Sequence, residues 1–152
     1  MSTKDLVSLA HALAGASSMV ASVMAKGQIA IPQQAAKSLG LGVFAAGCLL
    51  FAWSLVHLRA AFGGNVDPVT DRLVTTGPFR IVRHPTYLAM LVMAFGLALA
   101  LRSVLGMAVA AVVFIPFTIY RARLEEQSLE ERFGDVWKAY RSTTHFMLPL
   151  IY

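Results

Sequence analysis

The sequence predicts an all-α integral membrane protein with about four transmembrane helices. Of its 152 residues, 57% are hydrophobic and only 14% are charged, and the mean hydropathy is +0.65. In soluble domains about a quarter of the residues are usually charged, so this composition argues against a soluble globular protein. The 13 Lys and Arg residues fall between apolar segments instead of lining a polar face, which is typical of membrane proteins. We therefore expect membrane lipids, and no nucleic acid, among the partners.

The first transmembrane helix is expected at residues 6–25, which contain no Lys, Arg, Asp or Glu. A helix of this length, rising about 1.5 Å per residue, can cross a hydrocarbon core about 30 Å thick. Asp5 and the length of the run favour a retained span over a signal peptide, the alternative for this stretch. His11 is expected to bond a backbone carbonyl or a headgroup, without a functional role. Small residues that favour helix contact recur at every fourth position: Ala10, Ala14, Ser18 and Ser22.

The second span is expected at residues 39–58, after a connecting loop from Lys26 to Ser38. Gly42 and Ala46 have the spacing used for contact with another helix. The stretch from Arg59 to Pro85 is longer and more polar than most connections, and long loops in compact proteins tend to be functional. Its turn signals are Gly63-Gly64-Asn65, Asp67-Pro68 and Thr76-Gly77-Pro78.

The third and fourth spans are expected at residues 86–101 and 104–120, joined by Arg102 and Ser103. So short a connection predicts an antiparallel helical hairpin. Pro85 suits the first turn of the third helix, where its missing amide hydrogen costs nothing. Pro116 is expected to kink the fourth helix and to free a carbonyl.

The chain becomes strongly charged after Tyr120, and residues 121–152 are expected to form a cytosolic helical segment. A charged helix should end at Gly134, a plausible C-cap, and a short helix should follow over Asp135 to Tyr140. The apolar tail after it is too short to span a membrane. We therefore expect one membrane domain over residues 1–152.

The distribution of positive charge predicts the orientation of the chain. Four spans place both termini and the long loop on one side, together with ten of the 13 Lys and Arg residues. These ten are Lys4, Arg59, Arg72, Arg80, Arg83, Arg121, Arg123, Arg132, Lys138 and Arg141. The positive-inside rule makes that side cytoplasmic, so we expect an inner or plasma membrane protein with its polar face in the cytoplasm.

Polar side chains gather at the two ends that the hairpin brings together. They are Arg80, Arg83, His84 and Tyr87 at the start of the third span, and Arg121, Glu125 and Glu126 after the fourth. Carboxylates can accept hydrogen bonds from ribose hydroxyls, whereas Arg and His suit a carboxylate. The set therefore indicates a site for an anionic or zwitterionic nucleotide-like ligand. No metal site is expected, because the four histidines are scattered, and no Ser-His-Asp, phosphate-loop or dinucleotide pattern is present.

Two segments carry a resemblance to a known family. They read Gly-Pro-Phe-Arg-Ile-Val-Arg-His-Pro-Thr-Tyr at 77–87 and Glu-Glu-Gln-Ser-Leu-Glu-Glu-Arg-Phe-Gly-Asp-Val-Trp-Lys-Ala-Tyr at 125–140, with an apolar hairpin between them. In this order the chain resembles the isoprenylcysteine carboxyl methyltransferase and phospholipid methyltransferase superfamily of integral membrane enzymes. The resemblance covers Leu73 to Pro149, whereas the first two spans show no diagnostic match.

The resemblance implies S-adenosylmethionine as cofactor, with S-adenosylhomocysteine as product, covered by residues 121–152. The implied cofactor-binding residues are Arg83, His84, Pro85, Tyr87, Leu88, Glu126 and Tyr140. Arg121 and Glu125 match the pair beside the methyl acceptor and are the implied catalytic residues. Arg121 would orient a carboxylate acceptor, and Glu125 could deprotonate an amine, thiol or hydroxyl.

The acceptor is expected to be a small lipophilic or lipid-linked molecule that reaches the cytoplasmic membrane face, and the sequence leaves its reacting atom open. Two alternatives remain for the function. One is an NADPH-dependent membrane reductase related to sterol reductases, against which the short chain argues. The other is a non-catalytic membrane scaffold whose charged helix binds a partner. The small-residue faces permit self-association without requiring it.

Overall fold

The structure, a computed structural model, describes residues 3–58 and 73–148. The turn signals expected at 63–65 and 67–68 lie outside the described residues. In chain order the elements are α1 (Thr3–Met24), α2 (Gln33–Leu58), the 3-10 helix η2 (Gly77–Arg80), α3 (Pro85–Ala100), α4 (Val104–Val109), the π-helical turn η3 (Ala110–Phe114), α5 (Ile115–Phe133) and α6 (Asp135–Thr143). The prediction of an all-α protein is confirmed for this part of the chain, where one isolated bridge joins Val82 to His145.

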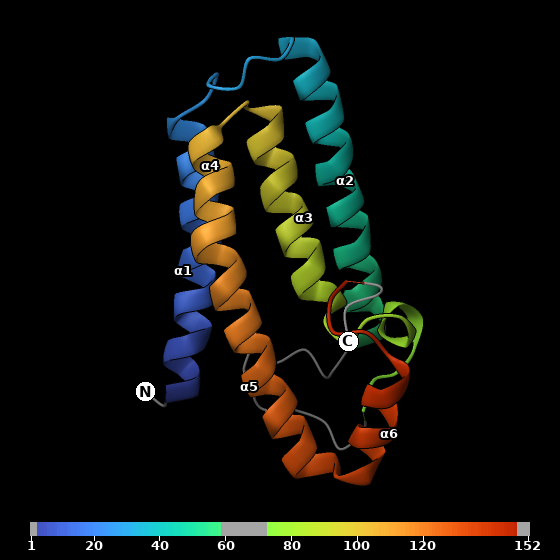
Figure 1. The fold of residues 1–152 in the computed structure, drawn as a ribbon. Helices are drawn as coiled ribbons and strands as arrows, with labels where there is room; N and C mark the ends of the chain where they lie inside the picture. The colour runs from blue at the N-terminus through green and yellow to red at the C-terminus, as the bar shows by residue number, and fades with distance from the viewer. Residues whose placement is uncertain (1–2, 59–72, 149–152) are drawn as a thin grey trace.

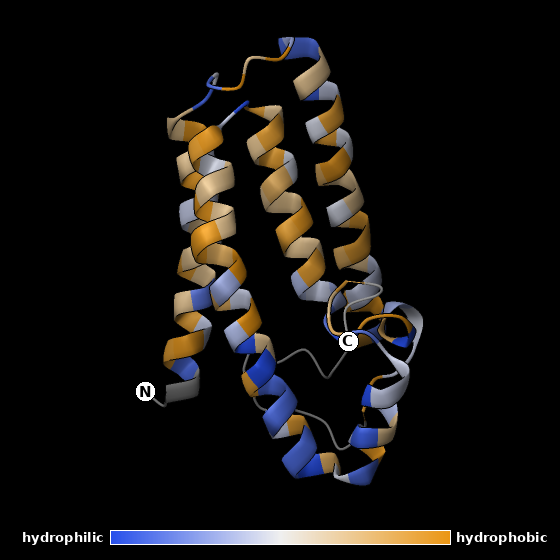
Figure 2. Ribbon diagram, in the orientation of Figure 1, coloured by the Kyte–Doolittle hydropathy of each residue, from blue (hydrophilic) through white to orange (hydrophobic). Residues whose placement is uncertain are grey.

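The long helices lie side by side, with α5 extending beyond the others at the end where α6 folds back (Figure 1). Their shared length is mostly hydrophobic, whereas the end of α5 and α6 are hydrophilic (Figure 2). Three helices are long and apolar enough to cross a membrane, namely Asp5–Met24, Gln33–Leu58 and the continuous helix Val104–Phe133. α3 is apolar but shorter, so the number of spans stays a prediction. The chain is thus an all-α integral membrane protein.

The helix α2 begins six residues before the expected start of the second span. Residues 33–38 were expected in the connecting loop, but the amide of Ala36 donates to the carbonyl of Pro32 at 3.0 Å and the helix begins at Gln33. Gln, Ala and Lys are strong helix formers, and a proline suits the start of a helix. Their polarity resembles that of a loop, but their helix propensity decides the local structure.

Close packing of α2 against α3 depends on glycines that the spacing argument did not select. A Cβ on Gly40 would lie 2.2 Å from the backbone nitrogen of Ala100, and one on Gly96 would lie 2.5 Å from that of Phe44. A Cβ on Gly42 would meet nothing within 4 Å, and both Gly42 and Ala46 are exposed, so they are not part of the contact between α2 and α3. The expected face of α1 is correct in part, because Ala14, Ser18 and Ser22 are buried.

We expect Gly40→Ala to lower the free energy of unfolding by about 1–3 kcal/mol, because the new methyl group would overlap the backbone of α3. Denaturant titration in detergent, followed by circular dichroism, measures this change. Gly42→Ala is the matched control, since it adds a methyl group to the same helix in open space. This control should be neutral or stabilising by up to about 1 kcal/mol. Equal effects of the two variants would contradict the packing described here.

The last long helix runs from Val104 to Phe133 without a break. Its hairpin connection to α3 is closed by Ser103, whose side chain accepts a hydrogen bond from the amide of Gly106 at 2.9 Å. The helix continues through Pro116 and takes a π-helical turn over Ala110–Phe114 just before it, and such turns are frequent at functional sites. The kink expected at Pro116 stays a prediction. Gly134, with φ of 52°, caps α5 as expected.

Candidate active site

The hairpin brings the start of α3 against the polar part of α5. Arg121 donates from Nε to the hydroxyl of Tyr87 at 2.7 Å, and that hydroxyl donates to Oε2 of Glu125 at 2.8 Å. The Arg121 guanidinium also lies over the Tyr87 ring, 5.7 Å from its centroid. Tyr87 therefore joins the two residues of α5 that the resemblance marks as catalytic, and fixes the guanidinium and the carboxylate relative to each other.

Arg83, in the segment before α3, is the centre of a second cluster that includes Glu126 of α5. Its Nε donates to Oε1 of Glu126 at 2.7 Å, with side chains only 4% and 10% exposed. One terminal nitrogen donates to the carbonyls of Arg141, at 3.1 Å, and Thr144. His84 contacts the same Glu126 oxygen at 3.2 Å. A guanidinium can hold several acceptors in fixed directions, so Arg83 ties α5, α6 and the segment before α3 together.

The C-terminal segment pairs with the segment before α3. The amides of Arg83 and His84 donate to the carbonyls of His145 and Phe146, at 2.8 and 3.2 Å. Tyr140 donates its hydroxyl to the carbonyl of Phe79 at 2.7 Å, and burial raises the pKa of this phenol, so the donor stays protonated. These backbone bonds fix the position of Phe146, whose ring packs edge-on against His84 with centroids 5.1 Å apart.

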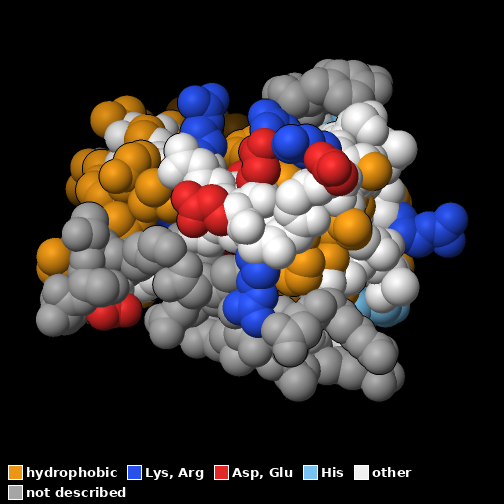
Figure 3. Space-filling view, turned by 90° about the horizontal axis from the view of Figure 1, so that it is seen from below, with side chains coloured by type: hydrophobic (Ala, Val, Ile, Leu, Met, Phe, Trp, Pro, Cys, Tyr) orange, Lys and Arg blue, Asp and Glu red, His pale blue; other side chains and the backbone are white. Residues whose placement is uncertain are grey.

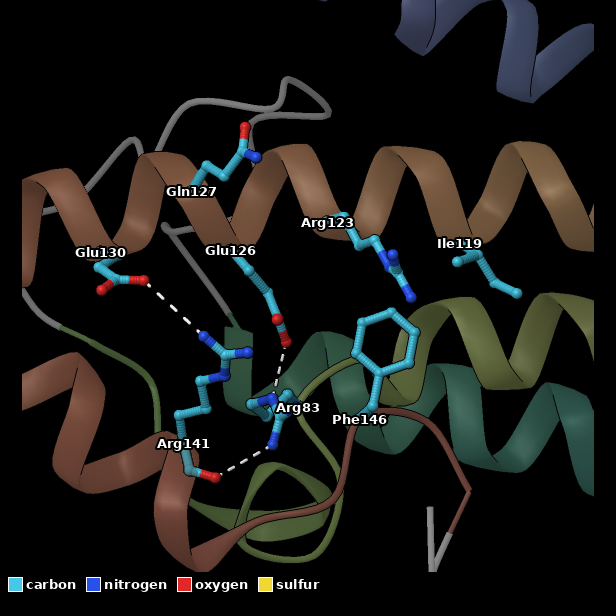
Figure 4. A pocket seen from close by; sticks show the side chains of 8 residues that line it. All are labelled: Arg83, Ile119, Arg123, Glu126, Gln127, Glu130, Arg141 and Phe146. Carbon is cyan, nitrogen blue, oxygen red and sulfur yellow. Dashed lines mark hydrogen bonds and ion pairs between the residues drawn. The ribbon is translucent and has the colours of Figure 1, made fainter. Parts of the chain in front are cut away.

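A polar cavity of about 630 Å³ lies between α5, α6 and the C-terminal segment (Figure 4). The residues that line it are Arg83, Ile119, Arg123, Glu126, Gln127, Glu130, Arg141 and Phe146. Glu130 and Arg141 approach each other across it at 3.8 Å. Seen from the α6 end, acidic and basic side chains gather close together on the surface of the molecule (Figure 3). The cavity thus offers both charges together with an aromatic ring.

An apolar cavity of about 400 Å³ adjoins the polar one. It is lined by Val43, Leu88, Leu91, Val92, Phe95, Ile115, Ile119, Phe146, Met147 and Leu148. Ile119 and Phe146 line both cavities, so a shared wall separates a charged space from an apolar one between the helices.

The expected cofactor residues do not all lie in one cavity. Arg83 and Glu126 line the polar cavity, whereas Leu88 lines the apolar one. Tyr87 stacks on His84 with an interplanar angle of 15°, but its hydroxyl belongs to the pair on α5. Pro85 is buried at the start of α3, and Tyr140 is half-buried on α6. Their roles toward a cofactor stay predictions.

His11 is the neighbour of this site that the sequence argument missed. Its Nε2 lies 3.1 Å from Oγ1 of Thr118, which donates its own hydrogen to the carbonyl of Phe114, so His11 is the donor in this bond. The ring packs edge-on against Tyr87, 5.2 Å between centroids. An ionisable residue inside an apolar span is a signal for a functional position, and this signal was available. Arg141 and Phe146, in contrast, lie in the polar cavity without any sequence signal for it.

Comparisons with known proteins identify the family. A family model described as phospholipid methyltransferase matches residues 35–136, so the match includes most of α2, which lacked a diagnostic pattern. Protein-S-isoprenylcysteine O-methyltransferase of Schizosaccharomyces pombe is 29% identical over 114 residues, 73% of this chain and 48% of that protein. The chain therefore spans about half the length of this relative. No solved structure gives a significant match. Because the family match covers well over half of the chain, the protein belongs to the phospholipid methyltransferase family.

Proposed function

We propose that the protein transfers a methyl group from S-adenosylmethionine to a lipophilic or lipid-linked acceptor. The observation that carries this proposal is the shared wall between the two cavities, formed by Ile119 and Phe146. A polar donor and an apolar acceptor need adjoining sites of opposite character, and the pair Arg121 and Glu125 lies on the same helix as Ile119 of the shared wall. Family membership supports the same reaction class.

The residues of the polar cavity fit the functional groups of S-adenosylmethionine. Glu126 and Glu130 can accept from ribose hydroxyls or an ammonium group, and Arg123 or Arg141 can bind a carboxylate. The ring of Phe146, which lines the cavity, can pack against adenine. Among the described residues, Arg83 and His84 both contact Oε1 of Glu126, which leaves Oε2 for a ligand. The cofactor would supply a methyl group on a positively charged sulfur, an electrophile that needs little further activation.

The protein's own residues would then align the acceptor and exclude water. Arg121 would orient an acceptor carboxylate, or Glu125 would take the proton of an amine, thiol or hydroxyl acceptor. Tyr87 would keep both groups in place through its hydroxyl. The Schizosaccharomyces pombe relative is named as an O-methyltransferase of protein S-isoprenylcysteine, and an isoprenyl chain suits the apolar cavity. We favour an acceptor oxygen beside such a chain.

Titration of the purified protein in detergent, by calorimetry, with S-adenosylhomocysteine and with NADPH separates the possible functions. We expect S-adenosylhomocysteine to bind and NADPH not to bind. Binding of NADPH alone would favour the reductase alternative, and binding of neither would favour the scaffold.

Substitution of Glu126 tests the proposed cofactor cavity. Glu126→Gln removes a carboxylate from the cavity and should weaken S-adenosylhomocysteine binding by about tenfold or more, as expected for loss of a charge-assisted hydrogen bond. Calorimetry of the variant measures the change. The control is Glu131→Gln, which makes the same replacement at an exposed position of the same helix outside the cavity, and should bind as the wild type does. Unchanged binding by Glu126→Gln would remove the cavity from the proposal.

We propose further that residues 1–152 form one membrane domain, with the polar cavity and both termini in the cytoplasm. The distribution of Lys and Arg supports this orientation. Protease access to tags at the two termini, in sealed inside-out vesicles, tests it. Cleavage of both tags is expected, and protection of either one would contradict the orientation.

A further inference from the structure

The end of the molecule opposite the polar cavity has its own fixed structure. There the connection between α1 and α2 lies beside the turn between α3 and α4 (Figure 1). The amide of Gly27 donates to the carbonyl of Leu101 at 2.9 Å, and the amides of Gln28 and Ile29 donate to that of Arg102 at 2.8 and 3.0 Å. These bonds join two connections that are more than 70 residues apart in the sequence, and hold them as one unit.

Arg102 is held in an unusual conformation at this end. It is the only non-glycine residue with a positive φ, 57°, in the described part of the chain. This backbone conformation is uncommon for a residue with a Cβ, and it persists only where the surroundings fix it. The side chain is fixed as well, because Nε donates to the carbonyl of Ile29 at 2.8 Å. No described residue bonds the two terminal nitrogens, which remain as donors.

Arg102 lines a small cavity together with a second cation, Lys26. The cavity measures about 180 Å³ and is lined by Lys26, Gly27, Gln33, Ala100, Leu101 and Arg102. The sequence contains no Asp or Glu between Asp5 and Asp67, or between Asp71 and Glu125. No acidic side chain from either connection can therefore neutralise Lys26 and Arg102. Two cations on one small cavity, with no acidic side chain on either connection, favour the binding of an anion from outside the protein.

We propose that this cavity binds the phosphate group of a phospholipid. A guanidinium with two free nitrogens matches phosphate oxygens, and a lysine adds a point charge. The cavity lies where the apolar helices end, at the level expected for lipid headgroups. Large apolar side chains close to it in the sequence are exposed and available to acyl chains, among them Leu39 at 61% and Val104 at 52%. These exposed residues favour a phospholipid over a soluble phosphate.

Native mass spectrometry of the full chain in detergent tests the proposal. Phosphatidylglycerol is compared with diacylglycerol, which lacks the phosphate, and with inorganic phosphate. We expect phosphatidylglycerol to remain bound and diacylglycerol not to bind. Lys26→Gln and Arg102→Asn should each weaken phosphatidylglycerol binding by about tenfold. Asn is chosen at position 102 because it tolerates a positive φ.

Lys37→Gln is the matched control, because it removes the same charge at the same end from a residue outside the cavity. It should bind the lipid within about twofold of the wild type, since only charges in contact with the phosphate contribute strongly. Equal weakening by Lys37→Gln, or unchanged binding by Lys26→Gln, would overturn the proposal. If the two cavity variants weaken the binding of inorganic phosphate but not that of phosphatidylglycerol, the cavity binds a soluble anion and the proposal is overturned. S-adenosylhomocysteine binding by Lys26→Gln should stay unchanged, which separates this site from the proposed active site.

Discussion

Replacing Arg121 with Ala is expected to lower methyl transfer by about a hundredfold or more while cofactor binding persists. The reason is geometric, because the Arg121 guanidinium donates to Tyr87 and Arg121 does not line the polar cavity. Loss of a group that positions the acceptor typically lowers the turnover rate by about this factor. Turnover measured with radiolabelled S-adenosylmethionine and an isoprenylated thioether carboxylate, together with S-adenosylhomocysteine calorimetry, checks both parts of this expectation.

Tyr87→Phe separates positioning from direct contact with the acceptor. The variant keeps the ring that stacks on His84 but loses the hydroxyl between Arg121 and Glu125. We expect a smaller loss, about tenfold, since both α5 side chains remain but are free to move. Arg132→Ala is a control for the loss of positive charge, because Arg132 is exposed on the same helix and does not line the polar cavity. Full turnover by Arg121→Ala, or loss of cofactor binding in that variant, would reject the role proposed for it.

The sequence predicts the helices well because the signals for them are local. Apolar runs, Ser103 and Gly134 act within a few residues, and the structure confirms the ends that they predict for α3 and α5. The rotation of α2 could not be predicted in the same way. This helix is apolar on most sides, so periodicity does not specify its contact face. The spacing of small residues indicates Gly42, whereas Gly40 packs closely against α3.

The candidate site was predictable only where its residues carry chemical signals. The hairpin brings Tyr87 to Arg121 and Glu125, and a short connection between two apolar helices is enough to expect that approach. The partners of Arg83 were not predictable, because the carbonyls of Arg141 and Thr144 belong to the backbone and leave no mark in the sequence. The apolar cavity likewise results from packing between distant helices.

The second large effect is expected at Arg83, and it concerns stability. Arg83→Ala should lower the free energy of unfolding by about 3–5 kcal/mol, because removing one member of a buried ion pair leaves an uncompensated charge. Here the remaining charge is Glu126, and the carbonyls of Arg141 and Thr144 also lose their donor. Denaturant titration in detergent, followed by circular dichroism, measures the loss.

Arg80→Ala is the matched control for this variant. Arg80 lies three residues earlier in the same segment but is exposed, so its removal should change stability by less than about 0.5 kcal/mol. Equal unfolding curves for the two variants would contradict the central role assigned to Arg83. The control also tests whether positive charge alone, rather than the described hydrogen bonds, stabilises this end of the molecule.

The double variant Arg83→Met, Glu126→Gln identifies the source of the loss. If an uncompensated carboxylate causes it, neutralising Glu126 should restore part of the stability that Arg83→Met removes, since a buried ion pair can often be replaced at little cost. If the lost bonds to the two carbonyls dominate instead, the second substitution should restore nothing. Either result leaves the double variant without the proposed cofactor carboxylate. It should therefore fail to bind S-adenosylhomocysteine tightly even where its stability recovers, which separates the structural role of this pair from its proposed role toward a ligand.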